Sequence, residues 1–163
     1  MSDPTDSCAP TDLASWTTSI NSRMTLAIDP ALSAPPLTLG RVVILVDDYD
    51  AALAFYQAAF GAQVLFDAPS PTGGRYLHIG FGSDGGIGVW FLHASGEAGA
   101  RVGRQTGGEP LAVFYTSDVG AAVARAVRAG ADVVRPIETA GGASFAHVAD
   151  LYGNVLVLAE LAA

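Results

Sequence analysis

The apolar and polar positions of this chain predict short strands interrupted by two amphipathic helices. Apolar runs of strand length, several rich in β-branched residues, are separated by clusters of glycine and proline. The predicted strands are residues 41–46, 62–66, 75–81, 88–93, 111–116, 131–134, 144–149 and 153–160. Turns are expected at 69–74, 83–86 and 141–142, and a loop with five glycines is expected at 94–108.

Each predicted helix lies between the first and second strand of a group of four. The first helix begins after Asp48, whose carboxylate can accept hydrogen bonds from the first-turn N–H groups, and ends at Gly61, which can adopt a left-handed conformation. The second begins after Asp118 and ends at Gly130. The apolar stripes expected to face the core are Leu53, Tyr56 and Phe60 in the first helix and Val119, Val123 and Val127 in the second.

These features indicate an internal duplication. Asp48-x-x-Ala-Ala-Leu corresponds to Asp118-x-x-Ala-Ala-Val at a shift of 70 residues, and Gly61-Ala-x-Val corresponds to Gly130-Ala-x-Val at a shift of 69. The expected fold class is therefore α+β, with two strand–helix–strand–strand–strand (βαβββ) units. Two such sheets, with helices on the outside, could form an open, barrel-like trough whose inner face is available to a small molecule.

The first 37 residues differ from the rest of the chain. They are rich in Ser, Thr, Asp, Ala and Pro, and we interpret residues 1–37 as a flexible extension. A short helix at 12–24 and an arm that packs on a partner subunit are the alternatives. The domain is expected at 38–163, with one unit at 38–95, a linker at 96–108 and a second unit at 109–161.

Composition and charge narrow the function classes. The net charge is −8, with eight arginines and no lysine, which argues against a nucleic-acid partner and excludes a Schiff base on a lysine side chain. No apolar run approaches the roughly 20 residues of a membrane span. The polar, acidic residues 1–10 predict no secretory signal, and the single Cys8 excludes an intrachain disulfide, so a cytoplasmic location is expected.

Two motifs carry a family resemblance. They are Val42-x-x-x-Val46-x-Asp48 leading into Ala54-Phe55-Tyr56-x-x-x-Phe60-Gly61, and Asp150-x-x-Gly153-Asn154-x-x-x-Leu158. With them the chain resembles, over residues 38–161, the vicinal oxygen chelate superfamily, which includes glyoxalase I, extradiol dioxygenases and the fosfomycin- and bleomycin-resistance proteins. The resemblance implies two βαβββ units around one pocket, commonly a homodimer, and in the enzymes one divalent metal held by His, Glu or Gln.

The positions that the resemblance assigns to the metal ligands carry other residues here. They are Arg41, its counterpart Leu111, Trp90 or Val89 because the register is uncertain by one, and Val157. None of these side chains offers a lone pair to a divalent cation, so we expect no metal and no other cofactor. The alternative is an unusual metal site built from His78, His93 and His147, with Glu160 as a fourth candidate.

Several residues could bind an organic ligand instead. Arg41 could bind a carboxylate or enolate. Alternatively, it could form a salt bridge to Asp118 or Glu160, or simply be exposed at the end of its strand. Aromatic strand residues could stack on a flat ligand. Gln105 could contribute an amide from a lid over the pocket, unless its loop is a plain linker. The candidate ligand-binding residues are Arg41, Trp90, Leu111, Tyr115, Val157, His78, His147 and Gln105.

The expected function is that of a metal-independent protein that binds an aromatic or polycyclic metabolite or antibiotic, as a homodimer. The alternative is an enzyme of the same fold, an isomerase, cyclase, lyase or dioxygenase. Such an enzyme would be metal-free with Arg41 as a catalytic group, or metal-dependent with relocated histidines. Neither a Ser/His/Asp nor a Cys/His constellation is indicated, because no serine lies in a nucleophile-elbow motif and Cys8 lies in the extension.

Overall fold

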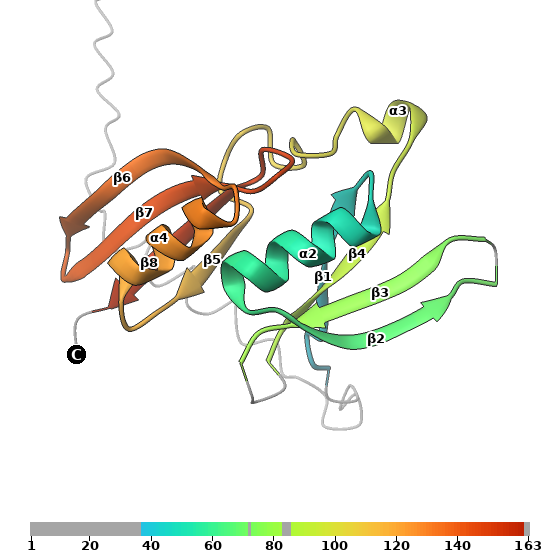
Figure 1. Ribbon diagram of the computed structural model, residues 1–163, viewed down its shortest axis with the longest axis horizontal. Helices are drawn as coiled ribbons and strands as arrows, with labels where there is room; N and C mark the ends of the chain where they lie inside the picture. Colours follow the sequence, from blue (N-terminus) through green and yellow to red (C-terminus); the bar gives the residue numbers. More distant parts are fainter. Residues whose placement is uncertain (1–36, 72, 83–85, 162–163) are drawn as a thin grey trace, which may run out of the picture. The chain divides into compact units, whose positions relative to one another are not determined.

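The structure is a computed structural model that describes residues 37–71, 73–82 and 86–161 (Figure 1). It divides into residues 1–38 and a compact domain, residues 39–163, that holds every described helix and strand. The elements are β1 (Arg41–Val46), α2 (Tyr49–Phe60), β2 (Gln63–Pro69), β3 (Arg75–Gly80), β4 (Gly88–His93), α3 (Gly96–Gly99), β5 (Ala112–Tyr115), α4 (Val119–Arg128), β6 (Asp132–Ala140), β7 (Ala143–Ala149) and β8 (Val155–Leu161).

Some predictions fall outside the described residues. They are the extension up to residue 36, with its alternative helix at 12–24, and the turn at 83–86 apart from its last residue. Within the described part of the chain, no helix is long and apolar enough to cross a membrane.

The predicted duplication is confirmed by two four-stranded sheets with the same topology. Their strand orders are β1-β4-β3-β2 and β5-β8-β7-β6. In each sheet the first and last strands of the unit pair in parallel, and the other pairs are antiparallel. The α+β fold class with two βαβββ units is therefore confirmed, and the two sheets stay open rather than closing into barrels.

The predicted helix signals act as expected. The Asp48 carboxylate accepts hydrogen bonds of 2.8 Å from the N–H groups of Asp50 and Ala51, at the start of α2. Gly61 ends that helix in the left-handed conformation, with φ of 70°. Asp118 begins α4 by accepting a 2.8 Å bond from the Ala121 N–H. These contacts satisfy backbone groups that a helix end leaves without partners.

The predicted apolar stripes are partly wrong. Tyr56 is fully buried, as expected, but Phe55 beside it is buried too. In α4 the buried residues are Val119 and Ala126, whereas Val127 is 46% exposed. The buried positions of α4 are seven residues apart, two helical turns, so Val127 lies about 100° around the helix from them. The buried residue near the end of α4 is thus Ala126 and not the expected Val127.

Two strands and one helix also differ from expectation. β2 and β6 run several residues past the predicted 62–66 and 131–134. Every residue of β6 is exposed. Its outer half therefore lacks the alternation of apolar and polar residues by which a half-buried strand is recognised in a sequence. The four-residue α3 lies inside the predicted loop, whose glycines had suggested that it contains no helix.

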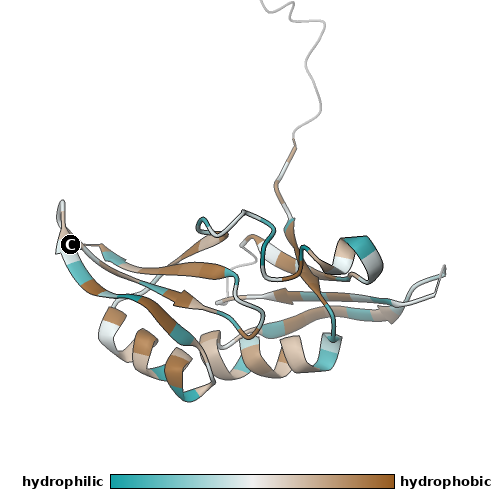
Figure 2. Ribbon diagram, turned by 90° about the horizontal axis from the view of Figure 1, so that it is seen from above, coloured by the Kyte–Doolittle hydropathy of each residue, from teal (hydrophilic) through white to brown (hydrophobic). Residues whose placement is uncertain are grey.

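Helices α2 and α4 each cover one face of one sheet, and no other described helix or strand covers the opposite face. Tyr56 of α2 packs on Phe91 of β4, with ring centroids 5.2 Å apart, and α4 packs on β6, β7 and β8. Figure 2 shows both helices on the same side of the sheets. We call the two uncovered faces the first open face (β1 to β4) and the second open face (β5 to β8). They are where a ligand can reach the strands.

Candidate functional site

The first open face is organised in rows that follow the strand pairing. Residues paired across neighbouring strands have side chains on the same face. The register therefore places Val43, Trp90, His78 and Phe66 in one row that crosses all four strands. The His78 ring lies 5.7 Å from the Trp90 ring and 5.5 Å from the Phe66 ring, measured between centroids. This aromatic row forms the middle of the face.

A second row extends the aromatic surface toward the end of β4. It contains Leu45, Leu92, Tyr76 and Ala68, again in strand order. The Tyr76 and Trp90 rings join the two rows, with centroids 6.0 Å apart. Trp90, Tyr76 and His78 thus form one continuous surface on which a flat molecule can stack.

Arg41 lies in the remaining row, opposite Gly88. A side chain at Gly88 would place its Cβ 3.0 Å from Cδ and 3.1 Å from Nε of Arg41. The stem of Arg41 therefore lies across Gly88, over the strand. One terminal nitrogen, Nη1, donates to the Gly40 carbonyl oxygen at 2.5 Å.

Two donors on this face have no partner in the part of the chain that the structure describes. They are Nε of Arg41 and Nε1 of Trp90, both buried from solvent. The salt bridges considered for Arg41 do not form. Asp118 instead begins α4, and the Glu160 carboxylate accepts a 2.9 Å bond from the Val119 N–H. A buried donor without a hydrogen-bond partner costs free energy. A bound molecule that accepts hydrogen bonds from these two N–H groups would therefore be stabilised.

His78 lies beside the arginine in the same surface. Burial lowers its pKa from the ordinary value of 6.5, and the positive charge of Arg41 lowers it further. The imidazole is therefore neutral at neutral pH. It can both donate and accept a hydrogen bond.

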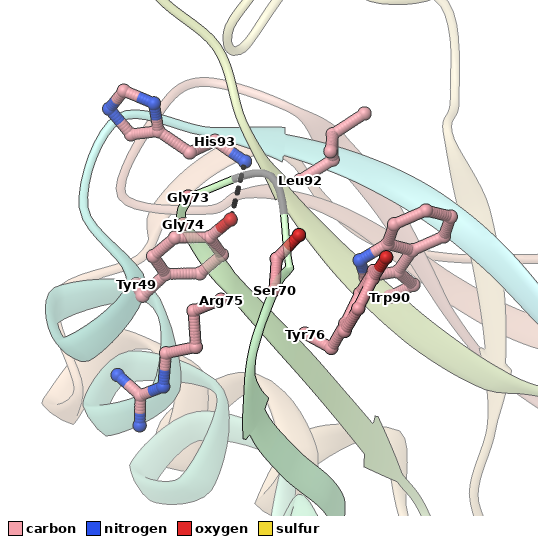
Figure 3. Close-up of a pocket in the computed structure, with 9 residues that line it drawn as sticks. All are labelled: Tyr49, Ser70, Gly73, Gly74, Arg75, Tyr76, Trp90, Leu92 and His93. Atoms are coloured by element: carbon pink, nitrogen blue, oxygen red, sulfur yellow. Dashed lines mark hydrogen bonds between the residues drawn. The ribbon is translucent and has the colours of Figure 1, made fainter.

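A pocket of about 360 Å³ lies next to Trp90 (Figure 3). Figure 3 shows Trp90 and Tyr76 on one side of it and Tyr49 and Arg75 on the other. Arg75 is paired with two carboxylates, Asp50 at 2.6 Å and Asp67 at 2.7 Å. The pocket is lined by Tyr49, Ser70, Gly73, Gly74, Arg75, Tyr76, Trp90, Leu92 and His93.

The second open face repeats this arrangement with different side chains. Its middle row contains Val113, Val157, His147 and Arg135. His147 thus has the position in the second unit that His78 has in the first, and Val157 corresponds to Trp90. Nδ1 of His147 is buried and has no hydrogen-bond partner among the described residues. Tyr115 lies in the neighbouring row of the same sheet and is 71% exposed.

The last two candidate residues lie close to the inter-unit linker. The side-chain amide of Gln105 accepts a 2.7 Å bond from the Leu45 N–H and donates a 3.2 Å bond to the Val43 carbonyl oxygen. It therefore occupies the free edge of β1, where a neighbouring strand would otherwise pair. Leu111 precedes β5 and packs against the core. The structure thus brings Arg41, Trp90 and His78 together on one face, and His147, Val157 and Tyr115 on the other.

The register also identifies residues that the candidate set omitted. Phe66, Tyr76 and Val43 belong to the first open face. Of the two residues considered for one site position, Trp90 lies on this face, because Val89 is buried on the helix side. The sequence does show which residues of one strand share a face, because they are spaced by two. The alignment of one strand with the next does not appear in a single sequence.

The residues at the family's metal positions do not fit a divalent cation. Arg41 and Trp90 offer only N–H donors, and Leu111 and Val157 offer no polar atom. His78 pairs with Trp90, and His93 lies three residues after Trp90 on β4. Because side chains alternate between the two faces along a strand, His78 and His93 lie on opposite faces of the first sheet. Within residues 37–71, 73–82 and 86–161, no group of three or more His, Cys, Asp or Glu side chains could hold a metal ion.

Comparison with known proteins agrees with this fold. Among solved structures, UcmS2 is 23% identical, with 77% of this chain and 98% of that chain covered and a TM-score of 0.66. TnmS3, an antibiotic binding protein from Streptomyces sp. CB03234, is 21% identical, with 79% and 99% covered and a TM-score of 0.65. TioX from Micromonospora sp. ML1 is 21% identical, with 76% and 98% covered and a TM-score of 0.56. A search of curated proteins found no match.

At these identities the structural likeness concerns the fold. The family pattern is a separate observation on the sequence itself. The pattern of the Glyoxalase/Bleomycin resistance protein/Dioxygenase superfamily matches residues 38–158, which is most of the chain. The chain belongs to the Glyoxalase/Bleomycin resistance protein/Dioxygenase superfamily.

Proposed function

We propose that this protein binds a flat aromatic or polycyclic small molecule, a metabolite or an antibiotic, on its first open face and without a metal ion. The observation that carries the proposal is the surface formed by Trp90, Tyr76 and His78, next to two unpartnered donors. Apolar and aromatic surface with a few oriented polar groups is what small-molecule sites usually present. That TnmS3, of similar fold, is an antibiotic binding protein is consistent with this proposal.

The donor set supports metal independence. The four positions at which relatives would hold the ion carry a guanidinium, an indole and two aliphatic side chains. A cation would gain no ligand there, and Arg41 would repel it. The affinity for the ligand should therefore be the same before and after treatment with a chelator.

Tryptophan fluorescence tests binding directly. The chain has two tryptophans, so a Trp16→Phe protein reports on Trp90 alone. We expect anthracene-2-carboxamide, a neutral flat probe, to quench Trp90 fluorescence saturably in chelator-treated protein. Trp90→Phe keeps an aromatic ring and should lower the affinity about threefold, whereas Trp90→Ala should lower it about tenfold or more. Equal affinities of the Trp90→Ala and parent proteins, measured by probe anisotropy, would contradict the proposal.

The fate of the probe separates a binding protein from an enzyme. Mass spectrometry after prolonged incubation should recover the compound unchanged. A new mass that depends on Arg41 would instead favour metal-free catalysis, and one that depends on added metal would favour a metalloenzyme.

We further propose a homodimer in which the second open face is covered, which leaves the first open face to the ligand. The second face exposes large apolar side chains, among them Val113 at 51% and Tyr115 at 71%. Contiguous exposed apolar surface of this kind commonly marks a contact with another chain. Light scattering should give twice the chain mass of 16.6 kDa. Val113→Glu should reduce the mass to that of one chain, and a monomeric parent protein would refute this part of the proposal.

A further inference from the structure

We infer that the ligand of the first open face is an aromatic acid, bound as its anion with a carboxylate oxygen against Nε of Arg41. This inference rests on the proposed function and adds the chemical class and the orientation of the ligand. Three features of the face support it: the state of Arg41, the groups beside it, and the pairing of the arginine at the far end of the surface.

Among the residues that the structure describes, Arg41 has no counterion. The ion pairs formed within the described residues involve Arg75, with Asp50 and Asp67, and none involves Arg41. Within the described residues, its Nη1 donates to the Gly40 carbonyl oxygen, while the buried Nε has no partner. A carboxylate that reached Nε would balance the charge and satisfy this unpartnered donor, and charge-assisted bonds of this kind are among the strongest in proteins.

The groups around Arg41 leave room for the ligand and add no competing charge. Gly88 opposite it has no side chain, so the guanidinium stem lies low on the sheet rather than projecting from it. His78 is neutral at neutral pH, because burial and Arg41 lower its pKa. The positive charge at this end of the surface is thus that of the arginine.

At the far end of the aromatic surface, the arginine that lines the pocket is already paired. Arg75 binds both Asp50 and Asp67 on the helix side of the sheet, so its charge is not free for an anion. The acid group should therefore point toward Arg41 and the uncharged end of the ligand toward the pocket.

The distance between the two ends sets the size of the aromatic body. Gly88, opposite Arg41, and Leu92, which lines the pocket, are four residues apart on β4, or about 13 Å at the rise of an extended strand. A ligand that spans this distance while stacking on Trp90 needs about three fused rings.

The matched probes anthracene-2-carboxylate and anthracene-2-carboxamide test the inference, since they differ in charge and hardly in size. We expect the parent protein at pH 7.5 to bind the carboxylate about tenfold more tightly than the amide, as measured by probe fluorescence, which corresponds to the usual advantage of a charge-assisted hydrogen bond. Arg41→Gln should remove this difference, chiefly by weakening the binding of the carboxylate.

Arg128→Gln is the control, because Arg128 is exposed on α4 and its loss changes the net charge equally. It should keep the tenfold preference. If the parent protein bound both probes with equal affinity, the inference would be overturned while the proposed function stood. If Arg128→Gln abolished the preference as fully as Arg41→Gln, long-range charge and not contact with Arg41 would explain it. If neither probe bound, both proposals would fail.

Discussion

The hydroxyl of Tyr56 on α2 donates a 2.8 Å hydrogen bond to Oδ2 of Asp150, which lies 94 residues further along the chain. Both residues are buried, and the bond joins the helix of the first unit to the turn before the last strand of the second. The same carboxylate also accepts from the backbone N–H groups of Tyr152 and Asn154 and from the Asn154 side chain, each at 2.9 Å.

This network gives a structural reason for the family motifs. The Phe-Tyr pair on the first helix and the Asp…Gly-Asn turn meet in one buried contact between the units. Tyr152 reinforces it by donating to the Asp48 carbonyl oxygen at 2.8 Å. Burial, together with the neighbouring carboxylates of Asp47 and Asp48, raises the pKa of Tyr152 to about 12, so its hydroxyl keeps its proton at physiological pH.

Tyr56→Phe should therefore destabilise the fold without affecting the open faces. The change leaves one lone pair of a buried carboxylate unsatisfied, which typically costs about 1–3 kcal/mol. Urea unfolding followed by circular dichroism measures the effect. The control is Tyr49→Phe, which removes a hydroxyl that accepts a longer, 3.2 Å bond at an exposed site. Equal losses in the two variants would show that the buried network does not join the units.

A second contact between the units involves Arg125 of α4. Its Nε donates to the Ala58 carbonyl oxygen at 2.7 Å and its Nη2 to that of Gln57 at 3.1 Å, at the carboxyl end of α2. A cation there satisfies carbonyl groups that the helix leaves free and complements the helix dipole. Arg125→Gln should lower the free energy of unfolding by about 1 kcal/mol. Arg128→Gln on the same helix should change it by less than about 0.5 kcal/mol.

Gly103 provides a test of how the linker is held. A Cβ there would lie 1.8 Å from the Tyr152 carbonyl oxygen, which is far inside contact distance. Gly107 in the same linker has a similar φ, 70° against 73°, but nothing within 4 Å of its Cβ position. Gly103→Ala should thus lower the melting temperature by several degrees more than Gly107→Ala. Similar melting temperatures for both variants would mean that the linker does not pack on the 150–154 turn.

The lowered pKa of His78 should make the stability of the fold depend on pH. Its pKa is lowered in the folded protein, so between pH 6.5 and the folded value the unfolded chain binds a proton that the folded chain does not. Stability should therefore fall as the pH drops below about 6.5. His78→Gln should lose less stability than the parent between pH 7.5 and 5.5 in urea unfolding. Parallel losses in the two proteins would contradict the assignment.

Much of the fold could be predicted from the sequence because its signals are local. Asp48 and Gly61 bound a helix through contacts within a few residues, and the repeat of these signals at Asp118 and Gly130 revealed the duplication. Val127 was misplaced because the stripe rule favours large apolar residues, whereas in the structure Ala126 is buried and Val127 is 46% exposed. The outer half of β6 is exposed on both faces and so carries no periodic signal.

The candidate site could be predicted only in part, because a single strand shows which residues share a face but not which residues lie opposite them. Trp90 and His78 emerged individually from the sequence, and only the pairing of β3 with β4 places their rings 5.7 Å apart. The role of Gln105 on the edge of β1 depends on a contact 60 residues away, which no local pattern signals.

A flat aromatic ligand that binds the first open face without a metal should change the surroundings of both unpartnered donors. Nitrogen–proton NMR of chelator-treated protein detects this change, because the indole N–H of Trp90 and the Nε–H of Arg41 have resolvable side-chain signals. On addition of anthracene-2-carboxylate, both signals should shift with the same saturation curve, and the indole signal of Trp16 should stay in place. Binding that leaves both signals unchanged, or that appears only when a divalent metal is restored, would contradict the account.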